Sequence, residues 1–434
     1  MQEATQTKLT REQKQAVGLL SIGTFLEYFD LMLYVHMAVL LNELFFPKYD
    51  PFTASLISAA AFCSSYMLRP FGAIIFGYIG DNIGRKHTVI ITTFLMSFSC
   101  LIMANLPTYA QIGITASWII TICRMLQGVS SMGEAVGAEL YLSEMIKPPL
   151  RYSSVALIVV AGTLGATISL AVASCVTSFG FNWRIAFWFG AGIALIGSIA
   201  RTTLRETTEF INAKKRVNST LKQSGISSKL INQKFFSKSK VKKITIIAYF
   251  FIECTGPLWF CITYIYCANI LKNSFGFTPE EIIHQNFLVA FVELLGTMVL
   301  TIIVIKMHPI KVLTIKLYIS AIFLILIPVL LNNISNYYEL LFLQLFIVVF
   351  APTGFPAFSV FCMNFPVYKR FMCTSLIFAI SRALMYAICS FGIVFATHYY
   401  NHWGLLIIIM PVIIGYALGL FYFRKLEESA GNYY

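Results

Sequence analysis

The chain has 434 residues, of which 58% are hydrophobic and 12% charged, with a mean hydropathy of +0.76 and a formal net charge of +13. A soluble globular domain carries about twice that charged fraction, so the composition excludes a soluble fold and indicates a membrane protein. The 10 cysteines are scattered and form no C-x-x-C or zinc-like group, so we expect no metal and no cofactor.

Long apolar runs dominate the chain after a polar start. The first fifteen residues lack the apolar core of a signal peptide, which predicts that the first run is a permanent helix. A membrane-spanning helix needs about 20 apolar residues. Twelve runs of about that length occupy residues 17–44, 54–80, 88–105, 112–142, 154–178, 183–201, 244–271, 282–305, 312–331, 338–363, 374–397 and 403–423. They do not alternate as barrel strands do, so they predict an all-α bundle of twelve transmembrane helices.

The basic residues follow the predicted loops. Of the 32 Lys and Arg, 26 fall in the two tails or in the loops on one side of the membrane, and only Lys48 and Lys272 fall in the opposite loops. The positive-inside rule then predicts that both termini are cytoplasmic. This placement explains the positive charge without nucleic-acid binding.

The polar stretch 202–243 divides six predicted helices from six. We therefore expect a cytoplasmic N-tail (1–16), an N-terminal six-helix half (17–201), a basic cytoplasmic linker (202–243), a C-terminal six-helix half (244–423) and a short C-tail (424–434). The loops KPPLRYSSVAL and NFPVYKRFMCTSL place Arg151 and Arg370 in similar settings, 219 positions apart. This weak repeat predicts pseudo-symmetric halves with a substrate site between them near the bilayer midplane.

An ionisable group inside a membrane helix costs about 3 kcal/mol, so each one needs a partner or a purpose. The first helix carries Glu27, Asp30 and Tyr34, which helical spacing puts on one face.

The fourth predicted helix carries a second polar stripe. Arg124, Gln127, Ser131 and Glu134 fall within about 80° of one another, and Glu139 lies about 60° to the other side of Arg124. A polar stripe on one helix needs a polar stripe on another, so we expect Asp30 or Glu27 to pair with Arg124 facing an aqueous cavity.

We interpret Asp30, Glu27, Arg124 and Glu134 as a proton-coupling group, in which a carboxylate exchanges a proton while Arg124 competes for it. The alternative is a permanent ion pair that only orients the helices. Asp30 is the deeper carboxylate, so we favour it as the carrier.

The second half has fewer charges inside its helices, mainly Glu253, Glu293 and Arg382. The segment APTGFPAF in the tenth predicted helix should free backbone carbonyls and bend the helix, and Pro257 gives the seventh a similar weak point. We assign these residues to the substrate cavity: Tyr34, Gln127, Ser131, Glu253 and Trp259.

The loop GYIGDNIGRKH, residues 77–87, resembles the loop signature G-x-x-x-D-R-x-G-R-R/K of the major facilitator superfamily. Asn82 stands where the family usually has Arg, so one charge is missing. The resemblance implies a cytoplasmic gate that latches the two halves. Gly77 should let helices approach, Gly84 should allow a sharp turn, and Asp81 should face a helix N-terminus. The predicted gate residues are Gly77, Asp81, Gly84, Arg85, Lys86, Glu144, Arg151 and Arg370.

Further segments narrow the resemblance to the metabolite:proton symporters. FLEYFDLMLY resembles E-W-Y-D-F-x-L-Y, RPFGAIIFGYIGD resembles R-P-x-G-x-x-x-F-G-x-x-G-D, and RMLQGVSSMGE resembles R-x-x-Q-G-x-x-x-G-G-E with Met132 in place of a glycine. The first 210 residues follow the family in order and spacing, and the second half follows it weakly. The chain is similar to bacterial proline/betaine transporters in particular.

This resemblance implies a multi-pass protein of the bacterial inner membrane that imports a small polar metabolite or osmolyte with protons. Proline and glycine betaine are the leading substrates, and dicarboxylates or other small metabolites are the alternative. The expected partners are a zwitterionic or anionic metabolite, protons and lipids, with the chain working as a monomer.

Three rival functions stay open. The first is an uncoupled uniporter or exchanger, and the second is a sensor or decayed paralogue that no longer transports. The third is a membrane enzyme, which the dispersed histidines disfavour because no catalytic motif is present.

Overall fold

The computed structural model describes residues 6–36, 41, 44–47, 66–179, 182–207, 211–212 and 241–433. Across these residues the regular structure is helical, apart from one isolated β-bridge between Gln6 and Pro149. The all-α prediction is therefore confirmed for the described chain. Most of the linker and much of the second predicted helix lie outside the described residues.

The helices of the first half agree with the predicted runs to within a few residues at most ends. They are α1 (Arg11–His36), α4 (Arg69–Asn82), α5 (Arg85–Asn105), the short α6 (Tyr109–Ile112), α7 (Ile114–Met145), α8 (Leu150–Phe179) and α9 (Arg184–Arg201).

The helices of the second half are interrupted more often, including by two π-helical turns. They are α12 (Lys243–Phe260), η1 (Cys261–Tyr266), α13 (Cys267–Phe275), α14 (Pro279–Ile303), α15 (Pro309–Asn332), α16 (Tyr337–Phe350), α17 (Phe358–Met363), α18 (Val367–Ala387), η2 (Ile388–Gly392), α19 (Ile393–Tyr400), η3 (Asn401–Trp403) and α20 (Gly404–Ala430).

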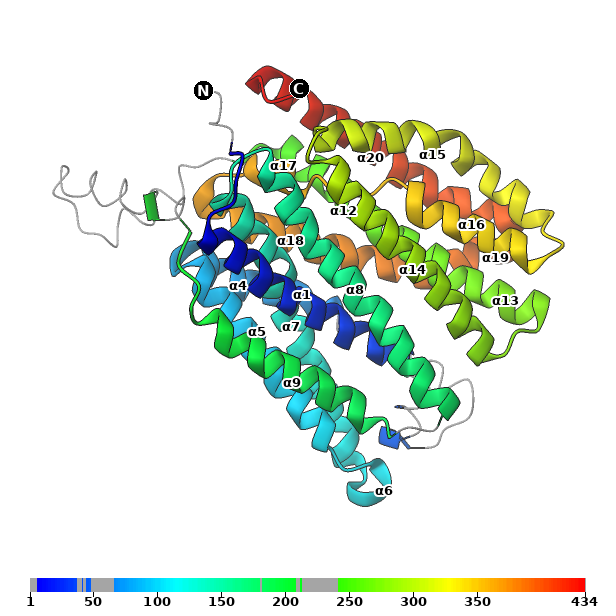
Figure 1. Ribbon diagram of the computed structural model, residues 1–434. Coiled ribbons are helices and arrows are strands. Elements are labelled where there is room, and N and C mark those ends of the chain that lie inside the picture. Colours follow the sequence, from blue (N-terminus) through cyan, green and yellow to red (C-terminus); the bar gives the residue numbers. More distant parts are fainter. Residues whose placement is uncertain are drawn as a thin grey trace.

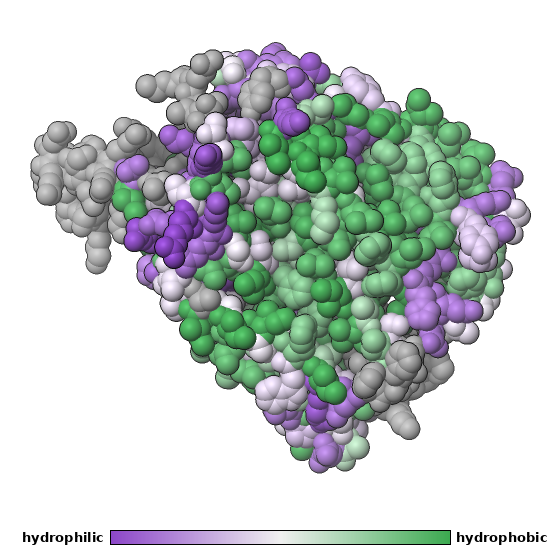
Figure 2. Space-filling model, in the orientation of Figure 1, coloured by the Kyte–Doolittle hydropathy of each residue, from purple (hydrophilic) through white to green (hydrophobic). Residues whose placement is uncertain are grey.

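The surface of the bundle suits a bilayer. Within the described residues, seven helical stretches are long and apolar enough to cross a membrane. Large apolar side chains face outward along them, such as Ile302, Ile322 and Phe395, each about two-thirds exposed or more. Figure 2 shows hydrophobic residues across the middle of the visible face and hydrophilic ones gathered toward its ends. An exposed apolar band of this kind is stable against lipid and unstable in water.

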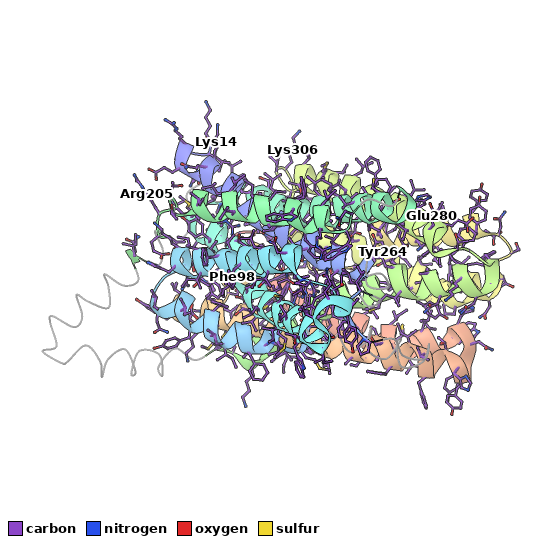
Figure 3. All side chains as sticks on the ribbon, turned by 90° about the horizontal axis from the view of Figure 1, so that it is seen from below. Lys14, Phe98, Arg205, Tyr264, Glu280 and Lys306 are labelled. Carbon is purple, nitrogen blue, oxygen red and sulfur yellow. The ribbon has the colours of Figure 1, made fainter. Side chains whose placement is uncertain are left out.

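The two halves meet along a seam made by α4 against α18 and by α8 against α14. The largest buried apolar cluster crosses this seam and includes Tyr141 of α7 and Phe371 of α18. Both chain ends lie at the same end of the bundle, at the upper left of Figure 1. We refer to it as the termini end; Lys14 and Arg205 lie there, and Glu280 lies at the opposite end (Figure 3).

Glycines allow some of the closest contacts between helices. A Cβ at Gly72 of α4 would collide with the backbone oxygen of Val129 in α7, and one at Gly165 of α8 would collide with that of Phe25 in α1. Because neither backbone can yield cheaply, these positions exclude larger residues. The small residues here therefore serve packing.

The tenth predicted helix is broken where APTGFPAF predicts. Helix α16 ends at Phe350 and α17 begins at Phe358. The break frees backbone carbonyls that find side-chain partners: the Trp259 indole donates to the Pro352 oxygen at 2.9 Å, and the Tyr416 hydroxyl donates to the Thr353 oxygen at 3.0 Å. These bonds satisfy polar groups that would otherwise be costly to bury.

The repeat between the halves has a structural counterpart. Arg151 Nε donates to the backbone oxygen of Ile146 at 2.8 Å, and Arg370 Nε donates to that of Phe365 at 3.0 Å. Each arginine thus bonds to the carbonyl five residues before it, at the start of α8 and of α18. The two loops share local geometry as well as sequence.

Candidate functional site

An ion pair joins α1 and α7 inside the first half. The Arg124 guanidinium lies 3.5 Å from Asp30 Oδ2, donates to Gln127 Oε1 at 2.9 Å and lies 4.0 Å from the centre of the Tyr34 ring. Asp30 and Arg124 are both about 3% exposed. Helical spacing brings these groups together, so the predicted polar stripes do face each other. Arg124 pairs with Asp30, one of the two expected partners.

Glu27 pairs differently from the expectation. Its carboxylate lies 3.8 Å from the Arg69 guanidinium, which comes from the start of α4. The Arg69 guanidinium also lies 4.5 Å from the centre of the Tyr66 ring. Glu27 and Asp30 of α1 therefore pair with two different arginines on two different helices.

Both pairs surround a void of only 10 Å³, which Gln127 and Ser131 also line. That volume admits about one water molecule. The Asp30–Arg124 pair is therefore enclosed in protein and does not face a broad aqueous cavity. The side chain of Glu134 lies outside the described part of the chain.

A larger cavity of 280 Å³ lies between the two halves, and we name it the central cavity. Its walls include residues of α1, α7 and α8 from the first half and of α12, α14, α15 and α18 from the second. Its charged lining residues are Arg69, Glu139, Glu253, Glu293, Lys316 and Arg382. The aromatic side chains of Tyr28, Phe260 and Tyr386 also contribute to its walls. This is the expected place for a substrate between two repeats.

The second half contributes its own ion pair to this cavity. Arg382 of α18 donates to Glu253 Oε2 of α12 at 2.8 Å, and its guanidinium lies 3.2 Å from the centre of the Phe378 ring. Glu253 was predicted as a cavity residue, and its side chain does line the central cavity. Tyr34, Gln127, Ser131 and Trp259, predicted with it, are not among the described lining residues of this cavity.

Lys316 lines the central cavity, although the count of basic residues assigns it to a loop. It is included among the 26 loop and tail charges, yet it lies inside α15 and is only 7% exposed. It lies within electrostatic range of Glu293, whose carboxylate accepts a 2.7 Å hydrogen bond from the Tyr264 hydroxyl. The sequence could have indicated this position, because Lys316 falls within the predicted span 312–331 and not before it.

An ionic cluster closes the seam at the termini end. Arg85 binds Glu144 through two bonds, of 3.1 Å from Nε and 3.0 Å from Nη2, and binds Asp81 at 3.0 Å. Arg370 of α18 donates to the same Glu144 at 3.0 Å, and Arg85 donates to the backbone oxygen of Val367 at 2.8 Å. These contacts tie the first half to the second through buried, charge-assisted bonds.

Asp81 bonds to the N-terminal part of α18, close to the helix end that the sequence predicts it to face. It accepts the backbone N–H groups of Phe371 and Met372, the fifth and sixth residues of α18, at 3.1 and 2.9 Å. Gly77, one turn earlier, brings α4 against α18, since a Cβ there would lie 2.8 Å from Met372 Cα. The positive end of the helix dipole favours a carboxylate near the N-terminus of α18.

The remaining predicted gate residues have lesser roles. Gly84 has φ +152° and forms the turn before α5. The backbone N–H groups of Arg85 and Lys86 bond to Glu206, at 3.0 Å for the first and 3.3 Å for the second. Glu206 was not singled out from the sequence. Arg151 bonds to its own loop, and no described ion pair involves the Lys86 side chain.

A second, smaller cluster crosses the seam nearby, and we name it the histidine cluster. His308, before α15, lies 3.8 Å from Glu427 of α20 and 5.4 Å, ring to ring, from Tyr152 of α8. Its Nδ1 accepts the backbone N–H of Ile310 at 3.3 Å, so the imidazole caps α15. Burial and then nearby Lys311 lower the pKa of His308 to about 4, from an ordinary 6.5.

An apolar helical bundle of two halves, with a charged cavity between them and a buried ionic cluster across one end, defines a membrane transporter rather than an enzyme. The sequence profile of the Major Facilitator Superfamily matches residues 20–372. The chain therefore belongs to the Major Facilitator Superfamily, and the resemblance seen in its sequence motifs is confirmed.

Its relatives include bacterial transporters. A putative proline/betaine transporter of Staphylococcus aureus (strain COL) is 34% identical over 211 residues, covering 46% of this chain and 45% of that protein. The proline/betaine transporter of Salmonella typhimurium (strain LT2) is 32% identical over 208 residues, covering 45% of this chain and 41% of that one. The match thus spans less than half of each relative. With its apolar helices, this family places the chain as a multi-pass protein of the bacterial inner membrane.

Solved structures share the fold. The proton:xylose symporter XylE bound to 6-bromo-6-deoxy-D-glucose superposes with a TM-score of 0.75 at 15% identity, covering 95% of each chain. The human organic anion transporter MFSD10 superposes with a TM-score of 0.67 at 15% identity, covering 95% of this chain and 100% of that one. At this identity the likeness extends to the fold alone.

Proposed function

We propose that the chain is a proton-coupled symporter that imports a small polar metabolite or osmolyte, with proline and glycine betaine as first candidates, by alternating access. The observation that carries this is the central cavity, which offers carboxylates and guanidinium groups to one small ligand between the two halves. The names of the bacterial relatives support the choice of substrate. The proposal includes twelve spans, cytoplasmic termini and a working monomer.

The coupling group is the buried cluster on α1 and α7. Asp30 and Arg124 are 3.5 Å apart, which is long for a charge-assisted hydrogen bond. Because both groups are enclosed, protonation of Asp30 would release Arg124 from its only described carboxylate partner. Proton binding at Asp30 would thereby change the contact between α1 and α7. Glu27, held by Arg69, is the alternative carrier.

The ionic cluster at the termini end is the proposed cytoplasmic gate. It consists of buried groups from both halves, so the halves cannot separate there without exposing Asp81, Arg85 and Glu144 together. Alternating access requires that this end closes while the other opens. In the described structure the cluster is closed.

Uptake into vesicles tests the proposed function. The purified chain is reconstituted, and accumulation of labelled proline and glycine betaine is measured with and without an imposed inward proton gradient. Gradient-dependent accumulation that a protonophore abolishes is expected. Accumulation that ignores the gradient would contradict coupling, and accumulation of a dicarboxylate instead of both compounds would contradict the substrate class.

A further inference from the structure

Glu139 of α7 is a buried carboxylate in the central cavity with no role assigned so far. It lines the cavity and is 9% exposed. Among the described residues, its carboxylate forms no hydrogen bond and no ion pair. It lies within electrostatic range of Glu253 and Arg382, so it faces the ion pair of the second half across the cavity.

Every other acidic group in or beside the cavity has a described partner. Glu253 is bonded to Arg382 and Glu27 is paired with Arg69, at 2.8 and 3.8 Å. Glu293 accepts the Tyr264 hydroxyl and lies within electrostatic range of Lys316. The cavity is lined by three described cations, Arg69, Arg382 and Lys316, and each of them faces one of these carboxylates. Glu139 is left without a described cation of its own.

An uncompensated buried carboxylate is expensive, and a positively charged ligand group removes that cost. The surroundings suit a charged nitrogen, because Tyr28, Phe260 and Tyr386 present aromatic rings to the same cavity. A second carboxylate brought by a dianionic ligand would instead add to the negative charge beside Glu139. The charge balance therefore favours a ligand with a cationic nitrogen.

Arg382 can hold the other end of such a ligand. Its guanidinium has five N–H donors, and one described bond, to Glu253, uses a single nitrogen. The side chain is 17% exposed and lines the cavity. Glu139 on α7 and Arg382 on α18 thus offer opposite charges from opposite halves of the molecule.

We propose that Glu139 binds the protonated amine of a zwitterionic, amino-acid-like substrate while Arg382 binds its carboxylate. A primary or secondary ammonium donates hydrogen bonds to Glu139, whereas a quaternary ammonium has no N–H to donate. Glu139 is then a specificity-determining residue that favours proline over glycine betaine and both over dicarboxylates. This inference rests on the proposed function only in taking the central cavity as the substrate site.

Direct binding to the purified full-length chain in detergent tests this without requiring a gradient. Four probes are compared by calorimetry: proline, glycine betaine, succinate and tetrahydrofuran-2-carboxylate, which has the proline ring shape without a charged nitrogen. The wild type should bind proline most tightly and succinate most weakly. Glu139→Gln should weaken proline binding by roughly tenfold or more and leave tetrahydrofuran-2-carboxylate binding unchanged.

Two further variants keep the test interpretable. Glu139→Asp retains the charge and should restore part of the preference for proline over tetrahydrofuran-2-carboxylate. Glu428→Gln makes the same chemical change at an exposed helix position, where the described ion pair is with Arg424. This variant should bind all four probes as the wild type does.

Several results would overturn the inference: unchanged proline binding in Glu139→Gln, equal weakening of proline and tetrahydrofuran-2-carboxylate, tighter binding of succinate than proline by the wild type, or binding of none of the four. The proposed proton coupling can fail independently of this inference. In that case uptake would not depend on the proton gradient, but the binding differences between the variants would persist.

Discussion

The ionic cluster and the histidine cluster cross the same seam at the same end of the molecule, but they are built from different chemistry. In the ionic cluster, Glu144 accepts bonds from Arg85, Arg370 and Thr207, so charges of opposite sign neutralise one another. In the histidine cluster, a buried imidazole caps α15 beside Glu427. The two third helices, α5 and α15, thus begin at the same seam with different acceptors: Glu206 for α5 and His308 for α15.

This difference teaches that a pseudo-symmetric fold need not have pseudo-symmetric electrostatics. Removing one member of the ionic cluster leaves its partners charged and buried, which is the costly case. Removing the imidazole leaves a smaller deficit, because His308 is neutral at physiological pH with a pKa of about 4. The first cluster should therefore dominate closure at this end, and the second should make closure sensitive to pH.

The largest effect is expected from Arg85→Met. The change keeps the bulk of the side chain but leaves Asp81 and Glu144 without their shared cation, which should destabilise the closed end by about 3–5 kcal/mol. Spin labels at exposed Ile83 and Lys306, one in each half, should then report a longer distance. Arg85→Lys retains the charge but not the bidentate bond, so its spin-label distance should lie between those of the wild type and Arg85→Met. An unchanged distance in Arg85→Met would show that the cluster does not hold the seam.

A pH dependence is the next largest effect. The pKa of His308 is lowered in the closed structure, so the closed state takes up its proton less readily than an exposed imidazole. Its contribution to closure should be complete above pH 6.5, decline as the pH falls toward about 4 and be lost below, which amounts to at most about 3 kcal/mol.

The same spin-label distance, measured from pH 7.5 to 4, checks this. His308→Asn keeps an acceptor that can cap α15 but does not titrate, and it should flatten the pH profile. The groups facing His308 are Glu427, Lys311, Tyr433 and Tyr152. If the asparagine variant keeps the wild-type profile, another of these groups sets the dependence.

Gly77→Ala tests the contact between α4 and α18 directly. The new methyl group would lie 2.8 Å from Met372 Cα, which is backbone and cannot yield alone, so the closed seam should lose about 1–3 kcal/mol. Gly137→Ala is the matched control, since its methyl group would meet the tip of the Phe371 ring at 3.2 Å. Equal thermal stability of the two variants would argue against a close approach at Gly77.

The smallest effect concerns Asn82, the position where the family signature usually has arginine. Its amide donates to the Tyr78 carbonyl at 2.9 Å, and it lies beside the cluster rather than inside it. Asn82→Arg should therefore change thermal stability by no more than about 0.5 kcal/mol. A larger stabilisation in a thermal melt would mean that this chain lacks a charge its seam can use.

Local sequence patterns predicted much of this structure. Three local features are found where the sequence predicts them. A close helix contact occurs at Gly77, Asp81 bonds to a neighbouring helix, and the segment APTGFPAF interrupts the tenth predicted helix. The pairing of Asp30 with Arg124 was also foreseeable, because helical spacing fixes which residues share a face.

The central cavity was not foreseeable to the same degree. Periodicity fixes the faces of one helix but not its rotation against helices distant in sequence. For that reason it did not show that Glu27 meets Arg69, that Glu139 faces the second half, or that Gln127 and Ser131 line a 10 Å³ void instead of the larger cavity. The position of Lys316 in the cavity was not predicted for a different reason. A basic residue near the edge of an apolar run cannot be told from a loop residue until its burial is known.

The most direct test of the account is transport by Asp30→Asn in reconstituted vesicles, measured as gradient-driven accumulation and as exchange of labelled for unlabelled proline. If Asp30 carries the coupled proton, the variant should lose accumulation and retain exchange, because substrate still binds in the central cavity. Accumulation of proline against its gradient by Asp30→Asn at the wild-type level would contradict the account.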